Sequence, residues 1–167
     1  MANNFFVGVD HYIFEAAESG DVAEIEDILS RNPKAVNLKT TNGNFTPLMF
    51  AKYHPDLVEF LISKGADVDA KDGSGMTALM MAIPFQNNNI ISLLILHSSD
   101  VNTKDLTGMT PLIRAAIAGN KDTIEKLISK GADIKAKDEH GKSSLQYALE
   151  GDRTDIVDLL REHGAKE

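Results

Sequence analysis

The side chains that could bind a metal ion or exchange protons are five histidines and 25 acidic residues. His97 and His163 occupy equivalent positions in two segments that a third similar segment separates, so they lie too far apart to share one metal ion. The other three histidines, His11, His54 and His140, are scattered along the chain. There is no cysteine, so disulfides and thiol chemistry are excluded. The sequence predicts no metal site and no cofactor.

The aspartates recur at a regular interval instead of forming one cluster. The two recurring sets are Asp67, Asp100 and Asp133, and Asp72, Asp105 and Asp138. Recurrence in every unit indicates a structural role, whereas a catalytic pair is a single arrangement. We expect the second set to accept backbone N–H bonds in turns.

The motifs of common enzyme classes are missing from the sequence. It contains no glycine-rich phosphate loop, no GxSxG and no HExxH. An enzyme on a repetitive scaffold would need polar residues unique to one unit. Only the neighbourhoods of Arg114 and His54 qualify, and neither has polar companions. We therefore predict no catalytic residues and no enzymatic activity.

A repeated sequence motif explains the regular spacing of the aspartates. The tripeptide GMT occurs twice, ending at Thr77 and at Thr110, and Thr46 and Ser143 occupy the same position in neighbouring segments. A second phrase, KGADVDA at 64–70, returns as HSSDVNT at 97–103 and KGADIKA at 130–136. The unit that begins at Thr46 is two residues shorter between the two phrases. Such a period is the signature of a repeat architecture.

The pattern of each unit predicts two short helices followed by a turn. Thr110 is a good N-cap, and Pro111 is tolerated at the first helical position. Gly119-Asn120 predicts a break between the two helices. Gly131 predicts that the second helix ends in a left-handed residue. Helices this short cannot bury their apolar faces alone, so the units must stack. The sequence predicts an all-α solenoid.

The repeated residues resemble the ankyrin repeat signature, most clearly in Thr110-Pro111-Leu112, Ala115-Ala116, Gly119-Asn120 and Gly131-Ala132-Asp133. The resemblance implies an α-solenoid of helix-turn-helix pairs joined by turns or short hairpins. We expect a single domain over residues 1–167. Its repeats are expected at about 10–39 (a degenerate N-terminal capping repeat), 40–70, 71–103, 104–136 and 137–167 (the C-terminal cap).

The chain departs from the family pattern at two kinds of position. The family usually has a histidine that donates hydrogen bonds to the adjoining turn, and that position holds Met49, Met80, Ile113 and Gln146. The turns must therefore be held in another way. Ser98 replaces a glycine expected to be left-handed, which predicts a strain of about 1 kcal/mol.

The resemblance implies a concave side formed by turn tips and first helices, and apolar residues occupy positions expected there. The candidate protein-binding residues are Phe45, Tyr53, Met76, Phe85, Leu106, Met109, Arg114, Ile117 and Lys142. Aromatic residues and methionine are enriched at interface cores. The alternative is that Met76 and Met109 pack between adjacent turns. Arg114 either forms a structural salt bridge to a neighbouring repeat or selects the partner.

The function implied by the resemblance is a protein-binding module without enzymatic activity. We expect an inhibitor, immunity-type or effector protein of bacterial origin, with a eukaryotic scaffold or adaptor as an alternative and a self-assembling array as a third class. The net charge of −8 favours a partner with a basic patch and disfavours nucleic acid.

The sequence shows no signal peptide and no membrane-spanning run, so a cytoplasmic monomer is expected, with secretion as an effector left open. The N-terminal segment NNFFVGV either folds over the first repeat or pairs with a second chain.

Overall fold

The computed structural model describes residues 11–166, and the NNFFVGV segment lies outside them. Within that range there are ten α-helices and no β-strand. The helices are α1 (Tyr12–Ser19), α2 (Val22–Arg31), α3 (Pro47–Phe50), α4 (Pro55–Ser63), α5 (Ala78–Ala82), α6 (Asn88–His97), α7 (Pro111–Ala118), α8 (Lys121–Ser129), α9 (Ser144–Glu150) and α10 (Thr154–Glu162). Two 3-10 segments, η2 (Pro33–Asn37) and η3 (Ile83–Phe85), follow α2 and α5.

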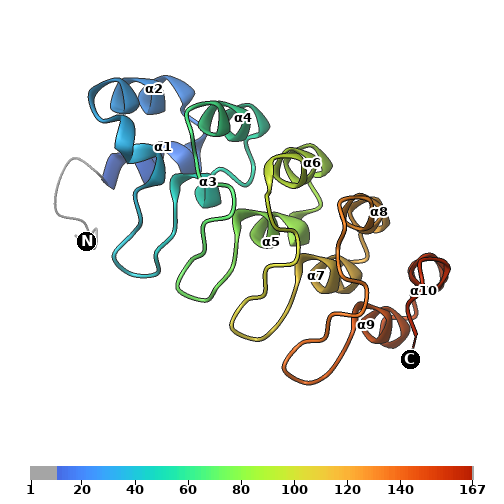
Figure 1. The fold of residues 1–167 in the computed structure, drawn as a ribbon. Helices are drawn as coiled ribbons and strands as arrows, with labels where there is room; N and C mark the ends of the chain where they lie inside the picture. The colour runs from blue at the N-terminus through green and yellow to red at the C-terminus, as the bar shows by residue number, and fades with distance from the viewer. Residues whose placement is uncertain (1–10, 167) are drawn as a thin grey trace.

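The helices stack in pairs along one axis (Figure 1). The first helices of the pairs, α1, α3, α5, α7 and α9, form a middle layer. The second helices lie on one side of this layer, and the long turns project from the other side. The predicted all-α solenoid is confirmed.

The helix boundaries follow from capping residues. The Thr110 side chain accepts a hydrogen bond from the Ile113 N–H at 3.3 Å, and Pro111 begins α7. The helix ends at Gly119, which is left-handed with φ of 74°. Thr77 and Ser143 cap α5 and α9 in the same way, so one local rule starts three successive units.

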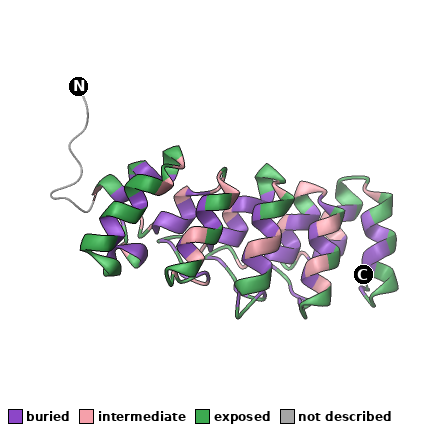
Figure 2. Cartoon of the chain, turned by 90° about the horizontal axis from the view of Figure 1, so that it is seen from above, coloured by how far each residue is buried: buried purple, intermediate pink, exposed green. Residues whose placement is uncertain are grey.

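One apolar core runs through the stack. Leu112, Ala115 and Ala116 of α7 are buried, as are Ile124 and Leu127 of α8. Buried positions continue from pair to pair along the array in Figure 2. Each pair thus buries its apolar face against its neighbours, which is why the units are stable only as a stack.

The two-residue deletion shortens the first helix of its unit. Helix α3 has four residues, against eight in α7. The ring of His54 lies close to the first pair, with its Nε2 3.0 Å from the Glu18 carbonyl oxygen. A Cβ on Gly20 would stand only 2.4 Å from this ring, so the glycine leaves room for the imidazole.

The predicted strain at Ser98 is wrong. Ser98 ends α6 in an extended conformation with φ of −69° and ψ of 137°, so its side chain meets no left-handed penalty. Its hydroxyl donates to Asp69 Oδ1 at 2.6 Å, and the Ser99 N–H donates to Oδ2 at 2.8 Å. In the neighbouring units the position of Asp69 is occupied by Asn37 and Asn102. The side-chain amide of each asparagine both donates a hydrogen bond to the next loop and accepts one from it. Because the Asp69 carboxylate only accepts, the next loop supplies hydroxyl donors.

The Asp69 contact predicts a pH-dependent stability. Partial burial acts to raise the pKa of Asp69, but hydrogen bonds from Ser98 and Ser99 outweigh it and lower the pKa below 3.8. A carboxyl whose pKa is lower in the folded state stabilises the fold above its unfolded pKa and loses this contribution as pH falls through the folded value.

We therefore expect the unfolding free energy of the wild type, minus that of Asp69→Asn, to be constant from about pH 7 to 5 and to fall below about pH 4. Urea unfolding followed by circular dichroism measures this difference, and the other carboxylates cancel because both proteins contain them. A difference that stays flat down to about pH 3 would refute the assignment.

Candidate functional site

The turns are held by the recurring aspartates, as predicted. Asp72 Oδ1 accepts the backbone N–H groups of Ser74 and Met76, each at 2.8 Å. The same pair of bonds forms at Asp105 with Thr107 and Met109, and at Asp138 with His140 and Lys142. In these three units one carboxylate oxygen thus closes the turn, without a histidine at the position that the resemblance led us to expect.

Neighbouring turns are also joined to one another through the backbone. The Gly73 N–H donates to the Gly43 carbonyl at 2.7 Å, Leu106 donates to Ser74 at 2.9 Å, and Glu139 donates to Thr107 at 3.0 Å. These bonds fix the spacing of the turn tips. The side chains on the tips are therefore presented by a continuous hydrogen-bonded edge.

Arg114 pairs with Asp105 inside its own unit, which corrects the predicted salt bridge to a neighbouring repeat. Partial burial acts to raise the pKa of Asp105, but the Arg114 guanidinium and the Thr107 bonds lower it below its ordinary value. In the next unit Tyr147 takes the same position and its hydroxyl donates to Asp138 at 2.6 Å. That hydrogen bond, with burial, raises the pKa of Tyr147 to about 12.

The ridge along the turns consists of the candidate residues that directly precede the helix caps, Phe45, Met76, Met109 and Lys142, and it is only half-exposed. Phe45 packs against the core, with its ring centroid 6.0 Å from that of Phe50. Met76 and Met109 are half-buried, so part of each side chain packs within the protein and part remains exposed. Lys142 pairs with Glu150, which ends the apolar ridge.

Two further candidate residues, Tyr53 and Phe85, are exposed aromatic residues from successive units. Tyr53 and Phe85 expose 53% and 46% of their surface. Their rings meet edge to face with centroids 5.1 Å apart. Lys52, which the sequence did not single out, places its Nζ 5.4 Å and 5.2 Å from the two ring centroids. The contact joins side chains from two successive units into one surface.

A shallow hollow continues this surface toward α7. It has a volume of about 190 Å³ and is lined by Pro84, Gln86, Arg114, Ile117 and Ala118. The Gln86 amide donates to the Ala118 carbonyl at 3.2 Å and closes one wall. Arg114 Nε is buried here without a hydrogen-bond partner among residues 11–166.

We call Tyr53, Pro84, Phe85 and Ile117 the apolar strip. Ile117, like the two aromatic residues, is exposed. Leu106, on a turn tip, is separate from the strip and exposes 75% of its surface, the largest exposed fraction of any large apolar residue among residues 11–166. Of the nine predicted residues, those most accessible to a partner are therefore Leu106, Tyr53, Phe85 and Ile117.

Two other kinds of site are absent from the described part of the chain. No three side chains of the metal-binding types are grouped there. No helix between residues 11 and 166 combines the length and apolar character needed to cross a bilayer.

Comparison with known families matches the geometry. The family model "Ankyrin repeats (3 copies)" matches residues 13–105 and 79–167. The chain belongs to the ankyrin repeat family. Ankyrin repeats generally mediate protein–protein interaction, and the family is typically a binding module.

Individual relatives match part of the chain. NAD-capped RNA hydrolase NUDT12 of Homo sapiens is 40% identical over 70 residues, which cover 41% of this chain and 15% of that protein. E3 ubiquitin-protein ligase XBAT33 of Arabidopsis thaliana is 33% identical over 94 residues, 54% of this chain and 18% of that protein. Ankyrin repeat and SAM domain-containing protein 6 of Mus musculus is 39% identical over 82 residues, 47% of this chain and 9% of that protein. The matched segments thus span less than a fifth of each of these relatives.

Proposed function

We propose that this ankyrin repeat chain binds another protein through the apolar strip and the Leu106 turn tip, and that it carries out no catalysis. The observation that supports the proposal most strongly is the exposed Tyr53–Phe85 ring pair, which lies beside the hollow bordered by Ile117. Exposed apolar surface of this kind usually marks an interaction site.

The side chains of the strip have the properties of interface anchors. Aromatic residues supply large contact area with few rotatable bonds, and residues that contribute most to binding tend to be aromatic or arginine. Arg114 is already held by Asp105, so its guanidinium need not be ordered when a partner binds.

The wider proposal concerns the partner and the setting. The net charge of −8 favours faster association with a basic protein. We propose a cytoplasmic monomer. The same surface would serve an inhibitor, immunity-type or effector protein of bacterial origin, or a scaffold or adaptor. The activities named for the hydrolase and ligase relatives are not proposed for this chain.

Affinity capture from a native extract tests the proposal. We expect the wild type to retain a specific protein, and we expect replacement of Tyr53, Phe85 and Leu106 by serine to reduce its recovery at least tenfold. Loss of one hot-spot residue alone can cost about 2 kcal/mol.

The matched control replaces three exposed residues of the outer helices, Glu26, Asp155 and Asp158, by serine. Thermal unfolding of all three proteins verifies the fold. Equal recovery of every specific protein by the strip variant and the wild type would contradict the proposal.

A further inference from the structure

The outer surface of α6 differs from that of every other second helix. When the second helices are aligned by their repeats, the position of Ser92 holds an acid in the other four, and the position of Leu96 holds a small or charged polar residue. The acids are Glu26, Glu59, Glu125 and Asp158, and the residues equivalent to Leu96 are Ser30, Ser63, Ser129 and Glu162. Helix α6 has no Asp, Glu, Lys or Arg over its full length, Asn88–His97.

Leucine at position 96 creates an apolar surface on the side opposite the turns. We call this surface, formed by Leu93, Ile95 and Leu96, the Leu96 notch. Leu96 exposes 67% of its surface. It lies between a groove of about 640 Å³ toward α8 and a groove of about 380 Å³ toward α4. Leu93, which is half-buried against the core, lines the smaller groove, and Ile95 lines the larger one. Leu96 is therefore an exposed apolar side chain between two grooves that other apolar side chains also line.

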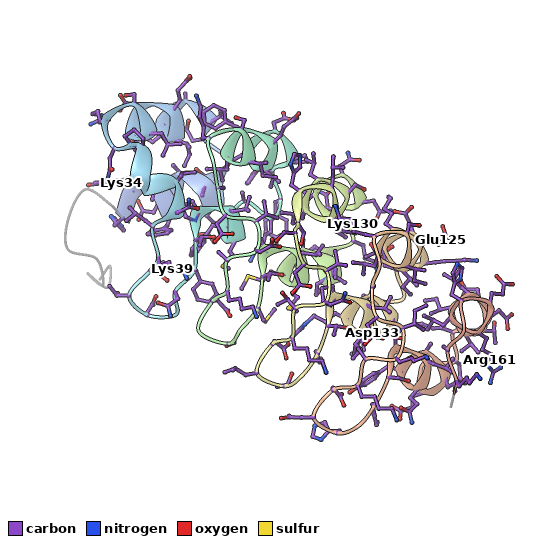
Figure 3. All side chains as sticks on the ribbon, viewed as in Figure 1. Lys34, Lys39, Glu125, Lys130, Asp133 and Arg161 are labelled. Atoms are coloured by element: carbon purple, nitrogen blue, oxygen red, sulfur yellow. The ribbon has the colours of Figure 1, made fainter. Side chains whose placement is uncertain are left out.

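Carboxylates flank the notch on both sides. Glu59 on α4 and Glu125 on α8 line the two grooves, and their carboxylates form no hydrogen bond or ion pair among residues 11–166. Figure 3 labels Glu125 and Lys130 on the side of the second helices.

The nearby lysines are engaged within the chain. Lys126 pairs with Asp122, and Lys130 donates to the Leu96 carbonyl at 3.0 Å. Asp56 adds a further acid to the α4 groove. Four acidic residues therefore surround the notch against two lysines, and the local charge is negative. The acids are Asp56, Glu59, Asp122 and Glu125.

We propose that the Leu96 notch is a second protein-docking surface. It would bind a segment that presents an apolar side chain between lysine or arginine residues. The apolar side chain would pack beside Leu96, and the basic residues would pair with Glu59 and Glu125. An uncharged centre with a charged rim is the usual composition of a protein interface. Since the notch and the apolar strip lie on different layers of the stack, one chain could hold two proteins at once.

The test uses a defined probe. It is a fluorescein-labelled amphipathic peptide of about 14 residues with leucine on one helical face and lysine on the other, compared with a leucine–glutamate peptide of the same pattern. Fluorescence polarisation gives the dissociation constants. We expect the lysine peptide to bind at least about tenfold more tightly than the glutamate peptide.

Leu96→Ser separates docking from general charge attraction. It leaves the net charge unchanged and restores the residue found at Ser63 and Ser129, so the fold is expected to be preserved. We expect it to weaken lysine-peptide binding at least about tenfold, and Glu59→Gln with Glu125→Gln to weaken it by a similar factor. The matched control, Tyr12→Ser, removes a large exposed apolar side chain on α1 that lines neither groove and has no part in the apolar strip, and it should leave binding unchanged.

Two results would overturn the proposal. Equal peptide affinity of Leu96→Ser and the wild type would show that attraction to the acidic chain is unspecific. Sedimentation velocity showing that Leu96 mediates a concentration-dependent dimer, which the peptide does not displace, would assign the notch to a second copy of the chain.

Discussion

Replacing Asp105 by alanine is expected to lower the free energy of unfolding by about 3 kcal/mol, because it leaves the buried part of Arg114 without its counter-ion. The substitution also removes the acceptor for the N–H groups of Thr107 and Met109 and for the Thr107 hydroxyl. Urea unfolding at pH 7 measures the change.

Arg114→Met is the matched control. In the preceding unit Met81 already occupies this position, and Asp72 retains its two backbone bonds without a cationic partner. We therefore expect Arg114→Met to change the unfolding free energy by less than about 1 kcal/mol. If the two variants were equally destabilised, the ion pair, and not the turn bonds, would hold this unit together.

Gly108→Ala is expected to destabilise the protein by about 2–3 kcal/mol. Gly108 has φ of 75°, where a Cβ costs about 1 kcal/mol. The added Cβ would also stand 2.9 Å from the backbone nitrogen of Glu139 in the next turn. Moving this nitrogen would disturb its bond to Thr107, and a forced contact of this kind costs a further 1–2 kcal/mol, roughly.

Gly141→Ala measures the left-handed cost without the clash. Gly141 has nearly the same φ, 74°, but no atom within 4 Å of an added Cβ. We expect this variant to lose only about 1 kcal/mol. Chemical denaturation of both variants gives the difference, and equal losses would show that the spacing between turns does not matter to stability.

The fold was predictable because its determinants are local and repeated. Thr110, Pro111 and Gly119 mark the ends of α7 in sequence and in structure, and a similar pattern recurs in the neighbouring units. The turn role of Asp105 followed from recurrence alone. The spacing of the two motifs showed a loss of two residues in the unit of Thr46, and the structure places that loss at the short helix α3.

Features that depend on pairs of residues from different units were not predictable. Ser98 was compared with glycine at its own position, whereas its conformation depends on Asp69 in the preceding unit. The Tyr53–Phe85 contact likewise needs the geometry between units. Leu96 could have been found by comparing second helices position by position, since serine occupies its place in α2, α4 and α8.

The most direct test of binding by the apolar strip is photo-crosslinking with benzoylphenylalanine. The photoreactive residue is placed at Phe85, which lies in the strip, or at Asp155, which is exposed on α10. We predict that the protein captured by the wild type crosslinks efficiently from position 85 and not from position 155. Crosslinking from position 155 with none from position 85 would contradict the account.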